Sequence, residues 1–465
     1  MGFHKVFLLL SLFFVLLFAC KNESFYGGND AQLIFSNDTI SFDTVFTSIG
    51  TTTQRLTVYN PYNKAVRISS IRLAGAKNSD FIININGLSA TNATDIDLSA
   101  KDSLIIFIQF FANPSGNNKP LLIKDSIFFD INNNTQNVKL EAFGQDVHLL
   151  KEQTIQSQEW IADKPYLIYG NITVEALSTL TIDKGAKLYF HRDANIRIKG
   201  SLIAKGDKQN PILFRGDRLE KYLQHSPAQW GGIALLPGSN NNVMDWVVIK
   251  NGISGIQIGG YNENSLADLV LSNSIIETMS YNCLLAMNAK ITSYNCVFAN
   301  ALTYTCGMLD GGDYKFYHCT FANFYGNLSA VYCNDYDTSK LNKISPIDAK
   351  FYNSIIYGFG NEVTFDFKGT YDGIPLFENC LISKLDTTDL VHFKNTIWYN
   401  YSRMSKDTIF TNADSDSLNF TLHKLSPAQN KGNLDIGKLY PLDLNLNNRI
   451  IDNKPDIGAY EFIEK

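Results

Sequence analysis

The sequence predicts an all-β protein, in which a small β-sandwich is followed by a longer domain of stacked β-coils. Tyrosine (23 residues) and phenylalanine (31 residues) are abundant whereas strong helix formers are sparse, which favours strands and turns. Short alternating apolar runs, separated by turn residues, follow the N-terminal segment. A four-residue pattern then recurs at intervals of 22 to 35 residues through the middle of the chain.

Composition limits the classes of partner. Of the 465 residues, 45% are hydrophobic and 18% are charged, so the chain can bury a core. The net charge is −5 and no run of lysine or arginine occurs. A nucleic-acid partner held through phosphate contacts is therefore not expected.

The N-terminus has the pattern of a targeting segment. His4 and Lys5 precede an apolar run, Val6–Phe18, that is too short to span a bilayer as a permanent helix. The run ends at Leu17-Phe18-Ala19-Cys20, which resembles the lipobox of bacterial lipoproteins. The resemblance implies that residues 1–19 are a signal peptide and that Cys20 receives the lipid.

Residues 20–31 are polar and contain glycine, so they are predicted to form a flexible tether. Several acyl chains hold a protein on a membrane, whereas one chain binds only marginally. The expected partner is thus a membrane, through the N-terminal lipid. The expected location is the cell outer membrane, on the periplasmic side or at the cell surface.

Residues 32–148 are predicted to form the sandwich. The runs singled out as strands are Thr39–Phe42, Arg55–Tyr59, Val66–Leu73, Ser103–Phe110, Leu121–Phe129 and Val138–Ala142. Pieces such as Phe42-Asp43-Thr44-Val45 and the closing Ala142-Phe143-Gly144-Gln145 resemble an immunoglobulin-like family of bacterial surface proteins and some ciliary proteins. That resemblance implies a spacer or adhesion role without catalytic residues.

Residues 149–424 are predicted to form the coiled domain. The order of phrases from Leu180–Ala186 through Ile196–Gly200 to Trp230–Ile233 resembles the opening coils of bacterial right-handed parallel β-helix proteins. The resemblance implies that fold, and the internal repeat supports it independently.

The repeat consists of a polar residue, then Cys or Ser, then two mostly apolar residues. It begins at Asn273, Asn295, His318, Asn353 and Asn379, with an earlier match at Asp245-Trp246-Val247-Val248. A second column, Cys283, Cys306 and Cys333, is predicted to run beside the first with the same period. Alternation of side chains places the Cys and Phe or Ile positions of the repeat inside.

Residues 425–465 are predicted to form a C-terminal cap. The phrases Leu434-Asp435-Ile436-Gly437 and Pro455–Phe462 resemble the closing segment of many secreted β-helix proteins. Asp456 and Glu461 could form an acid pair, but their place in a cap favours a structural role.

Six cysteines remain besides Cys20, in an oxidising compartment. Stacked coils bring such residues to bridging distance, yet their side chains run in parallel, which is poor disulfide geometry. Buried free thiols are therefore predicted. No C-x-x-C motif occurs and the seven histidines are scattered, so a zinc site is not expected.

One candidate groove follows the second cysteine column. Its residues are Asp310, Asp313, Tyr314 and Lys315 after Cys306, and Asp335, Tyr336 and Asp337 after Cys333. Neighbouring coils would bring the carboxylates together, where they raise one another's pKa or take up a cation such as Ca²⁺. The tyrosines, with Tyr304 and Tyr332, would offer flat faces to sugar rings. The alternative is that these are solvated turn residues at coil corners.

No catalytic residue can be assigned and no cofactor is expected apart from Ca²⁺. The favoured function is a cell-envelope lipoprotein that presents its β-helix for binding a polysaccharide or a surface protein. The alternatives are a polysaccharide lyase or glycoside hydrolase that uses the acidic groove, and a structural spacer.

Overall fold

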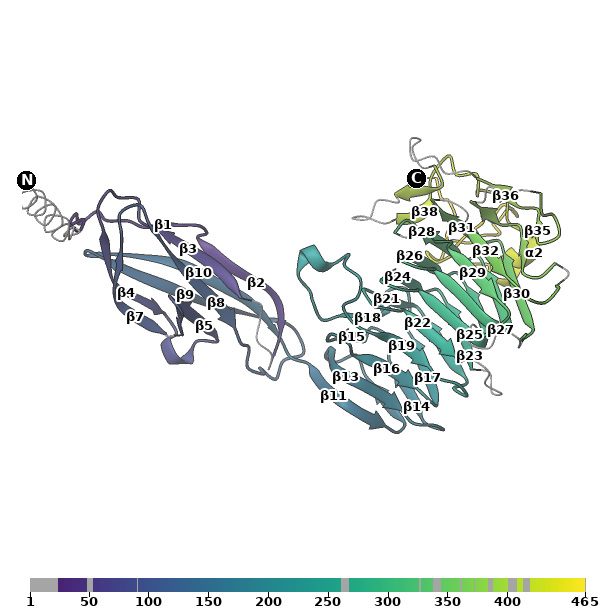
Figure 1. Ribbon diagram of the computed structural model, residues 1–465, viewed down its shortest axis with the longest axis horizontal. Helices are drawn as coiled ribbons and strands as arrows, with labels where there is room; N and C mark the ends of the chain where they lie inside the picture. Colours follow the sequence, from purple (N-terminus) through teal and green to yellow (C-terminus); the bar gives the residue numbers. More distant parts are fainter. Residues whose placement is uncertain are drawn as a thin grey trace, which may run out of the picture. The chain divides into compact units, whose positions relative to one another are not determined.

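The computed structural model describes residues 24–47, 53–89, 91–260, 267–325, 328–337, 344–359, 362–371, 373–383, 388–399, 408–412 and 419–464. The predicted signal peptide and the predicted lipidation site, Cys20, lie outside the described residues. The chain divides into two compact units, Met1–Asp146 and Val147–Lys465 (Figure 1).

The first unit contains two five-stranded sheets. One has the order β1 (Ile34–Phe35), β3 (Gln54–Tyr59), β8 (Ser103–Phe110), β5 (Phe81–Ile85) and β6 (Leu88–Ser89). The other has the order β2 (Thr39–Phe46), β10 (Asn134–Gln145), β9 (Leu121–Ile131), β4 (Val66–Leu73) and β7 (Asn92–Leu98), and a 3₁₀ turn, η1 (Ala76–Asn78), follows β4. Inward side chains of both sheets share one core, as in a β-sandwich. All six segments singled out from the sequence are strands, whereas β5 and β7 were not singled out.

The second unit is one continuous 26-stranded winding, β11 to β36, whose pairings are parallel. For most of its length each strand pairs with the strand three places later, so one coil contains three strands. This is the predicted right-handed parallel β-helix, and the all-β fold class is confirmed.

The strands stack into three sheets, here named I, II and III. Sheet I contains the second half of β13 (Tyr166–Val174), whose first half belongs to sheet III, together with β16 (Asn195–Ile198), β19 (Gly232–Leu235), β22 (Ile256–Gly259), the first halves of β25 (Leu284–Tyr294) and β27 (Cys306–Tyr317), β29 (Val331–Asn334) and β32 (Val363–Asp366). Sheet II contains β12 (Gln158–Trp160), β14 (Thr179–Ile182), β17 (Ser201–Lys205), β20 (Asn242–Asp245), β23 (Asp268–Ser272), the second halves of β25 and β27, β30 (Ile347–Tyr352), β33 (Leu376–Glu378) and β35 (Phe393–Lys394). Sheet III contains β15 (Lys187–Phe190), β18 (Ile212–Gly216), β21 (Val247–Lys250), β24 (Ile275–Met279), β26 (Val297–Ala301), β28 (Thr320–Asn323), β31 (Ile355–Gly358), β34 (Leu381–Ile382) and β36 (Ile397–Trp398). Strand β11 (His148–Ile155) opens the winding beside β13.

The four-residue repeat marks the corner between sheets II and III. Its polar residue adopts left-handed backbone in every coil, with φ between 46° and 53° at Asn273, Asn295, His318, Asn353 and Asn379. The next residue points inward, and Cys296 and Cys319 lie in contact in neighbouring coils. The first predicted column is therefore confirmed.

The earlier match is shifted by one residue from the predicted frame. Val248 pairs with Ile275, so Trp246, with a φ of 50°, occupies the position of Asn273. Asp245 precedes this corner and instead accepts a hydrogen bond from the Asn273 side chain at 2.8 Å.

The prediction that Cys283, Cys306 and Cys333 form a second column was wrong in register. Cys306 pairs with Leu284 and with Val331, so Cys283 lies one position before the row and Cys333 two positions after it. The coils here are 22 and 25 residues long, whereas the cysteines are 23 and 27 apart. All six cysteines are nonetheless buried and free, as predicted for thiols that fill the core.

The interior of the coils is apolar and aromatic. Phe298 and Phe321 stack at 4.9 Å between ring centroids in neighbouring coils, and Phe351 and Phe377 stack at 4.5 Å. These contacts repeat along the winding and form one core. Each coil thus depends on its neighbours for the burial of its inward side chains.

The C-terminal segment differs from a cap placed over the last coil alone. It follows the strand pair β37 (Phe410–Asn412) and β38 (Asn419–Leu422), includes the short helix α2 (Leu434–Leu439), and runs along the side of several coils. Lys208 donates to the Leu444 carbonyl at 3.0 Å, and Asn295 donates to the Leu442 carbonyl at 2.8 Å. The segment therefore spans coils whose residues lie about 170 positions apart, from Lys208 to Asn379.

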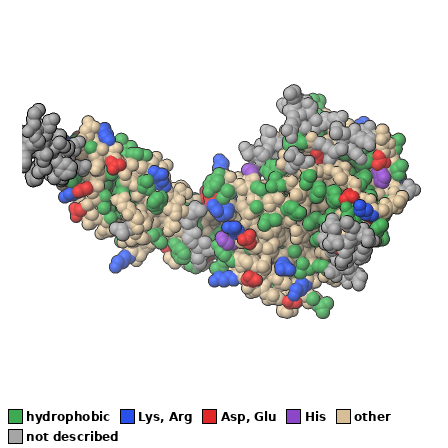
Figure 2. Space-filling model, in the orientation of Figure 1, with side chains coloured by type: hydrophobic (Ala, Val, Ile, Leu, Met, Phe, Trp, Pro, Cys, Tyr) green, Lys and Arg blue, Asp and Glu red, His purple; other side chains and the backbone are tan. Residues whose placement is uncertain are grey.

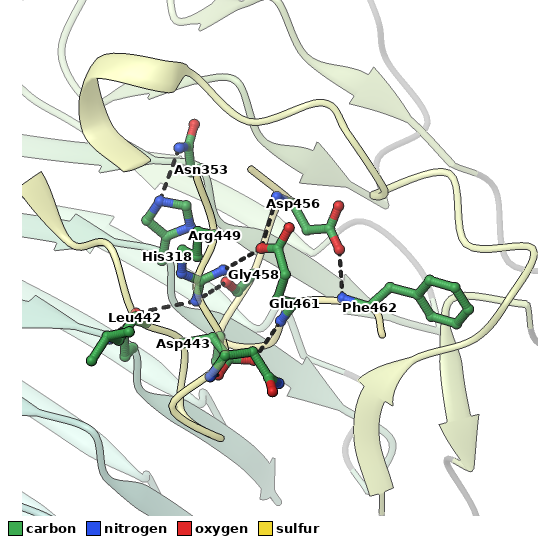
Figure 3. A network of polar contacts seen from close by, with 12 residues as sticks. His318, Asn353, Leu442, Asp443, Arg449, Asp456, Gly458, Glu461 and Phe462 are labelled. Atoms are coloured by element: carbon green, nitrogen blue, oxygen red, sulfur yellow. Dashed lines mark hydrogen bonds and ion pairs between the residues drawn. The ribbon is translucent and has the colours of Figure 1, made fainter. Parts of the chain in front are cut away.

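A separate apolar core joins this segment to sheet III. The outward side chains of β26, β28, β31 and β34, such as Val297, Ala322 and Tyr357, pack against Phe410, Leu444 and Ile457. Figure 3 shows the polar contacts beside this core, where His318 and Asn353 face Arg449, Gly458 and Glu461. Arg449 is fully buried and bonds to Glu461 at 3.3 Å, to Asn295 at 3.2 Å and to the Gly458 carbonyl at 3.1 Å.

Candidate functional site

The predicted groove residues separate into three groups, because β25 and β27 bend sharply from sheet I into sheet II. The bend occurs at Asn288 and Asp310, whose φ values are 44° and 57°, and at the two glycines after Asp310. Residues before the bend face one outer surface and residues after it face another. The sequence did not reveal this corner.

Asp310 and Asp335 lie in the corner and are fully buried. Asp310 accepts a hydrogen bond from the Ser345 hydroxyl at 2.6 Å. Asp335 accepts from the Lys368 and Gly369 amides at 2.9 and 2.7 Å and from the Tyr371 hydroxyl at 3.0 Å. Both carboxylates therefore hold chain turns together, and the prediction that they line an open groove was wrong.

Asp337, also assigned to the groove, is 2% exposed. Its burial contradicts a place on an open surface as well. The alternative interpretation, turn residues at a coil corner, describes Asp310 and Asp335 better, although they are buried rather than solvated.

Asp313 and Lys315 lie on the outer face of sheet II. Their side chains form an ion pair at 3.2 Å, and Asp348 and Lys350 repeat the pair at 2.8 Å on the next strand. Tyr314, between them, points inward and is fully buried, with its hydroxyl donating to the Gly311 carbonyl at 2.7 Å. Tyr314 therefore cannot stack on a ligand, and that part of the prediction was wrong.

Tyr336 belongs to a third group, here called the tyrosine face: Tyr304, Tyr332, Tyr336, Asp366 and Lys368. Tyr304 and Tyr332 are half-buried and stack at 4.7 Å between ring centroids, whereas Tyr336 is buried, at 7% exposed. The hydroxyls of Tyr332 and Tyr336 both donate to Asp366 Oδ2, at 3.1 and 2.5 Å. The Lys368 ammonium lies 5.1 Å from the centroid of the Tyr336 ring.

The electrostatics of the tyrosine face follow from the Asp366 carboxylate. Its hydrogen bond raises the pKa of Tyr336 to about 12. Burial, with Asp366 adding to it, raises the pKa of Tyr332 as well. Both phenols are neutral at ordinary pH, and each uses its one O–H to donate to Asp366, so the face suits ring stacking and the acceptance of hydrogen bonds rather than proton abstraction.

The sequence did not single out Asp366 and Lys368. In the strand register, Asp366 pairs with Asn334. Thr364, two positions earlier, pairs with Tyr332. The longer interval before this coil hid that alignment. The alternation in Phe365-Asp366-Phe367-Lys368 was the available signal for a strand with outward polar residues.

Metal and membrane features were searched in the described part of the chain. There, no three or more His, Cys, Asp or Glu side chains are placed to hold a metal ion. Nor does any helix among those residues have the length and apolar character needed to cross a bilayer. In Figure 2, green hydrophobic side chains and tan atoms, which include the backbone, cover most of the visible side of the second unit.

Comparison with known families agrees with the fold. The family model described as a right-handed beta helix region matches residues 132–321. The match begins near β10 of the first unit and ends within β28. Fold and match together define the class, a protein with a right-handed parallel β-helix domain.

No curated protein matches the chain. Among solved structures, the PapD-like domain 7 of human CEP192 is similar at 10% identity, with a TM-score of 0.19, over 26% of this chain and 90% of that one. A family 123 glycoside hydrolase from Clostridium perfringens is similar at 6% identity and a TM-score of 0.19, over 26% of this chain and 30% of that one. The catalytic unit of a GH87 alpha-1,3-glucanase from Streptomyces thermodiastaticus strain HF3-3 is similar at 9% identity and a TM-score of 0.17, over 79% of this chain and 91% of that one.

Proposed function

We propose that this protein is a cell-envelope lipoprotein whose β-helix binds a glycan at the tyrosine face. The observation that carries the proposal is the stacked pair Tyr304 and Tyr332 beside a carboxylate, Asp366, that already accepts two phenol hydroxyls. Tyrosine combines a flat apolar ring with a polar tip, which suits the apolar faces and hydroxyl rim of a sugar.

The geometry of the tyrosine face supports glycan binding better than it supports glycoside hydrolysis. A glycoside hydrolase of the usual kind needs two carboxyl groups on either side of one bond. On the tyrosine face Asp366 is half-buried and faces outward, whereas neighbouring Asp335 is fully buried and held by backbone amides. A carbohydrate-active enzyme remains the alternative, and the same assay tests it.

The binding test is affinity electrophoresis of the purified protein in gels that contain neutral or acidic polysaccharides. We expect retardation by at least one polysaccharide, and weakening by about 10-fold in Tyr332→Ala, because a lost aromatic contact costs about 1.4 kcal/mol. Tyr222→Ala is the matched control, since Tyr222 is 74% exposed and lies outside the tyrosine face. Equal retention of the two variants would contradict the proposal.

Two other outcomes have separate meanings. Release of reducing ends or of unsaturated products from the same polysaccharides would favour the enzyme. A protein that is not retarded by any polysaccharide would favour a protein partner or a structural spacer, with the sandwich, proposed to be immunoglobulin-like, as part of that spacer.

The membrane anchor is tested separately through Cys20. We expect the native protein to fractionate with outer membranes and to incorporate labelled fatty acid, because acyl chains add membrane affinity for each buried methylene. Cys20→Ser should lose both properties. Retention of the label in that variant would exclude Cys20 as the lipidated residue.

A further inference from the structure

A row of charged side chains crosses the outer face of sheet III in the early coils. Tyr189 pairs with Arg215, and Lys250 pairs with Glu277. Phe214 pairs with Ile249, so Arg215 and Lys250 occupy neighbouring positions on adjacent strands. Adjacent strands lie about 4.8 Å apart, which brings the two cationic side chains side by side.

Within the described chain, Glu220 acts on Arg215 and Glu277 acts on Lys250, but neither carboxylate lies within ion-pair distance of its cation. Neither cation forms an ion pair there, and Arg215 Nε is buried without a hydrogen-bond partner while Nη2 donates to the Arg218 carbonyl at 3.0 Å. Burial lowers the pKa of both groups, and Arg215 lowers that of Lys250 further. Like charges placed opposite each other on neighbouring strands are destabilising unless an anion is shared between them.

The neighbouring charges are already paired elsewhere. Arg218 bonds to Glu220 at 2.9 Å, and Asp217 bonds to His191 at 2.7 Å. Glu277 is the remaining carboxylate of the row, and it follows Lys250 rather than lying between the two cations. In the described chain, therefore, no carboxylate is shared between the adjacent Arg215 and Lys250 side chains.

The row is flanked on two sides. The segment after β18 contains the 3₁₀ turn η2 (Lys221–Leu223) and is fixed by Gln229, whose amide donates to the Leu223 carbonyl at 2.7 Å. Burial raises the pKa of Glu277. Lys250, and also His225 of the segment that contains η2, oppose this rise. Glu277 in turn adds to the raised pKa of Tyr460 in the C-terminal segment.

We propose that Arg215 and Lys250 together bind one oxyanion group, a carboxylate or sulfate, at a site separate from the tyrosine face. The guanidinium supplies a planar fork with an unused donor, and the ammonium supplies a second charge beside it. The bound group is either the acidic substituent of a sugar or a free inorganic anion. The site lies on sheet III, whereas the tyrosine face lies on sheet I.

The experiment is isothermal titration of the purified protein with sodium sulfate, sodium glucuronate and neutral glucose, at constant ionic strength set with sodium chloride. We expect saturable binding of sulfate or glucuronate and none of glucose. Stronger binding of glucuronate identifies an acidic sugar as the source, and stronger binding of sulfate identifies an inorganic or sulfated ligand.

Three variants test the residues. Lys250→Met and Arg215→Met should each weaken binding by at least about 10-fold, the effect of losing about 1.4 kcal/mol. Glu277→Gln should strengthen it several-fold, because a competing carboxylate is removed. Lys187→Met is the matched control, since Lys187 is an exposed lysine on β15 of the same sheet and should leave the affinity unchanged.

The proposal is overturned by any of three results. These are the absence of saturable binding by the native protein, equal losses in Lys187→Met and Lys250→Met, or weaker binding in Glu277→Gln. Far-UV circular dichroism of each variant shows whether a loss reflects unfolding. The Glu277→Gln variant tests the site even if both cationic variants fold poorly, because its expected effect is a gain.

Discussion

At the scale of single residues, the coil corners depend on residues that tolerate left-handed backbone. Asparagine and histidine occupy the corner between sheets II and III from Asn273 to Asn379. Asparagine side chains also hydrogen-bond along the column, as from Asn295 to Asn273 at 3.1 Å. Asparagine accepts this conformation at lower cost than other non-glycine residues, and a β-branched residue accepts it worst. The polar residue of the repeat is thus explained by backbone geometry rather than by solvent exposure.

Asn353 provides a test of that explanation. We expect Asn353→Val to be less stable than Asn353→Gly by about 1–3 kcal/mol, because valine adds the strain of left-handed backbone. Both variants lose the same side-chain bonds to Asn433 and His318, so their difference isolates the backbone. Urea unfolding measures it, and equal midpoints would contradict the explanation.

Glu461 is expected to make stability depend on pH. Burial, and then the neighbouring Asp456, raise the pKa of Glu461 from 4.5 to about 8, while Arg449 opposes the shift. Between these values the folded state holds a proton that the unfolded state has released. Stability from this group is therefore greatest below pH 4.5 and falls as pH rises towards 8, by at most about 1.4 kcal/mol per pH unit.

The variant Glu461→Gln removes this titration while it keeps an oxygen that can accept hydrogen bonds from Arg449 and the Asp456 amide. We expect its stability to change less between pH 5 and 8 than that of the native protein. Urea midpoints at four pH values in this range give the two slopes. Parallel slopes would show that Glu461 titrates normally in the folded state.

At the scale of elements, Arg449 joins the C-terminal segment to the coils. Removal of its side chain breaks the buried bonds to Glu461, to the side-chain oxygen of Asn295 and to the Gly458 carbonyl, so Arg449→Ala should cost about 3–5 kcal/mol. Arg192→Ala is the control, because that side chain is 83% exposed and should change stability by less than about 0.5 kcal/mol.

Limited proteolysis provides a second measurement for the same pair of variants. We expect faster cleavage between residues 425 and 462 in Arg449→Ala, since the segment loses contacts to the coils. Unchanged cleavage with lowered stability would mean that the destabilisation spreads over the whole β-helix instead.

The sequence predicted the strands of the winding better than their register. The first column was recognised because the corner imposes one residue type, a polar residue with left-handed backbone, before an inward Ser or Cys. The second column, Cys283, Cys306 and Cys333, has no such constraint, and its prediction rested on residue spacing alone. A difference of one residue per coil is enough to move a side chain to another row.

The candidate site was predicted only in part, for a related reason. Asp310 and Asp335 were correctly expected in neighbouring coils, but the corner turns them inward, and Tyr314 alternates into the core. Tyr336 was predicted as a groove residue and is only 7% exposed, and its partner Asp366 is 30 residues away and follows an interval of irregular length. Contacts of this kind depend on loop lengths that the repeat does not specify.

At the scale of the whole molecule, the family match and the winding have different extents. The match ends at residue 321, where the interval between corners lengthens from 23 to 35 residues. The parallel register nevertheless continues through β31, β34 and β36. Inserted residues therefore interrupt the sequence pattern without interrupting the ladder of hydrogen bonds.

The cysteines give a prediction for the intact fold. All six cysteines beyond Cys20 are fully buried and free. Burial raises the thiol pKa of five of them, to about 12 for Cys380, whereas at Cys319 burial is outweighed by hydrogen bonding with Cys296, which lowers its pKa. A thiol reagent should not label them in the native protein but should label all six in denaturant, because the thiolate is the reactive form. Rapid labelling of the native Cys20→Ser variant would contradict the packing of the core.

The lateral path of the C-terminal segment has a consequence for biogenesis. Outward side chains of β26, β28, β31 and β34 are covered by residues between Ile409 and Ala459, which leave the ribosome after the strands they cover. Until those last residues emerge, a nascent chain exposes the apolar outer side chains of these four strands to solvent. Truncated translation products of this protein should therefore be strong clients of chaperones, whereas the complete chain should be released from them.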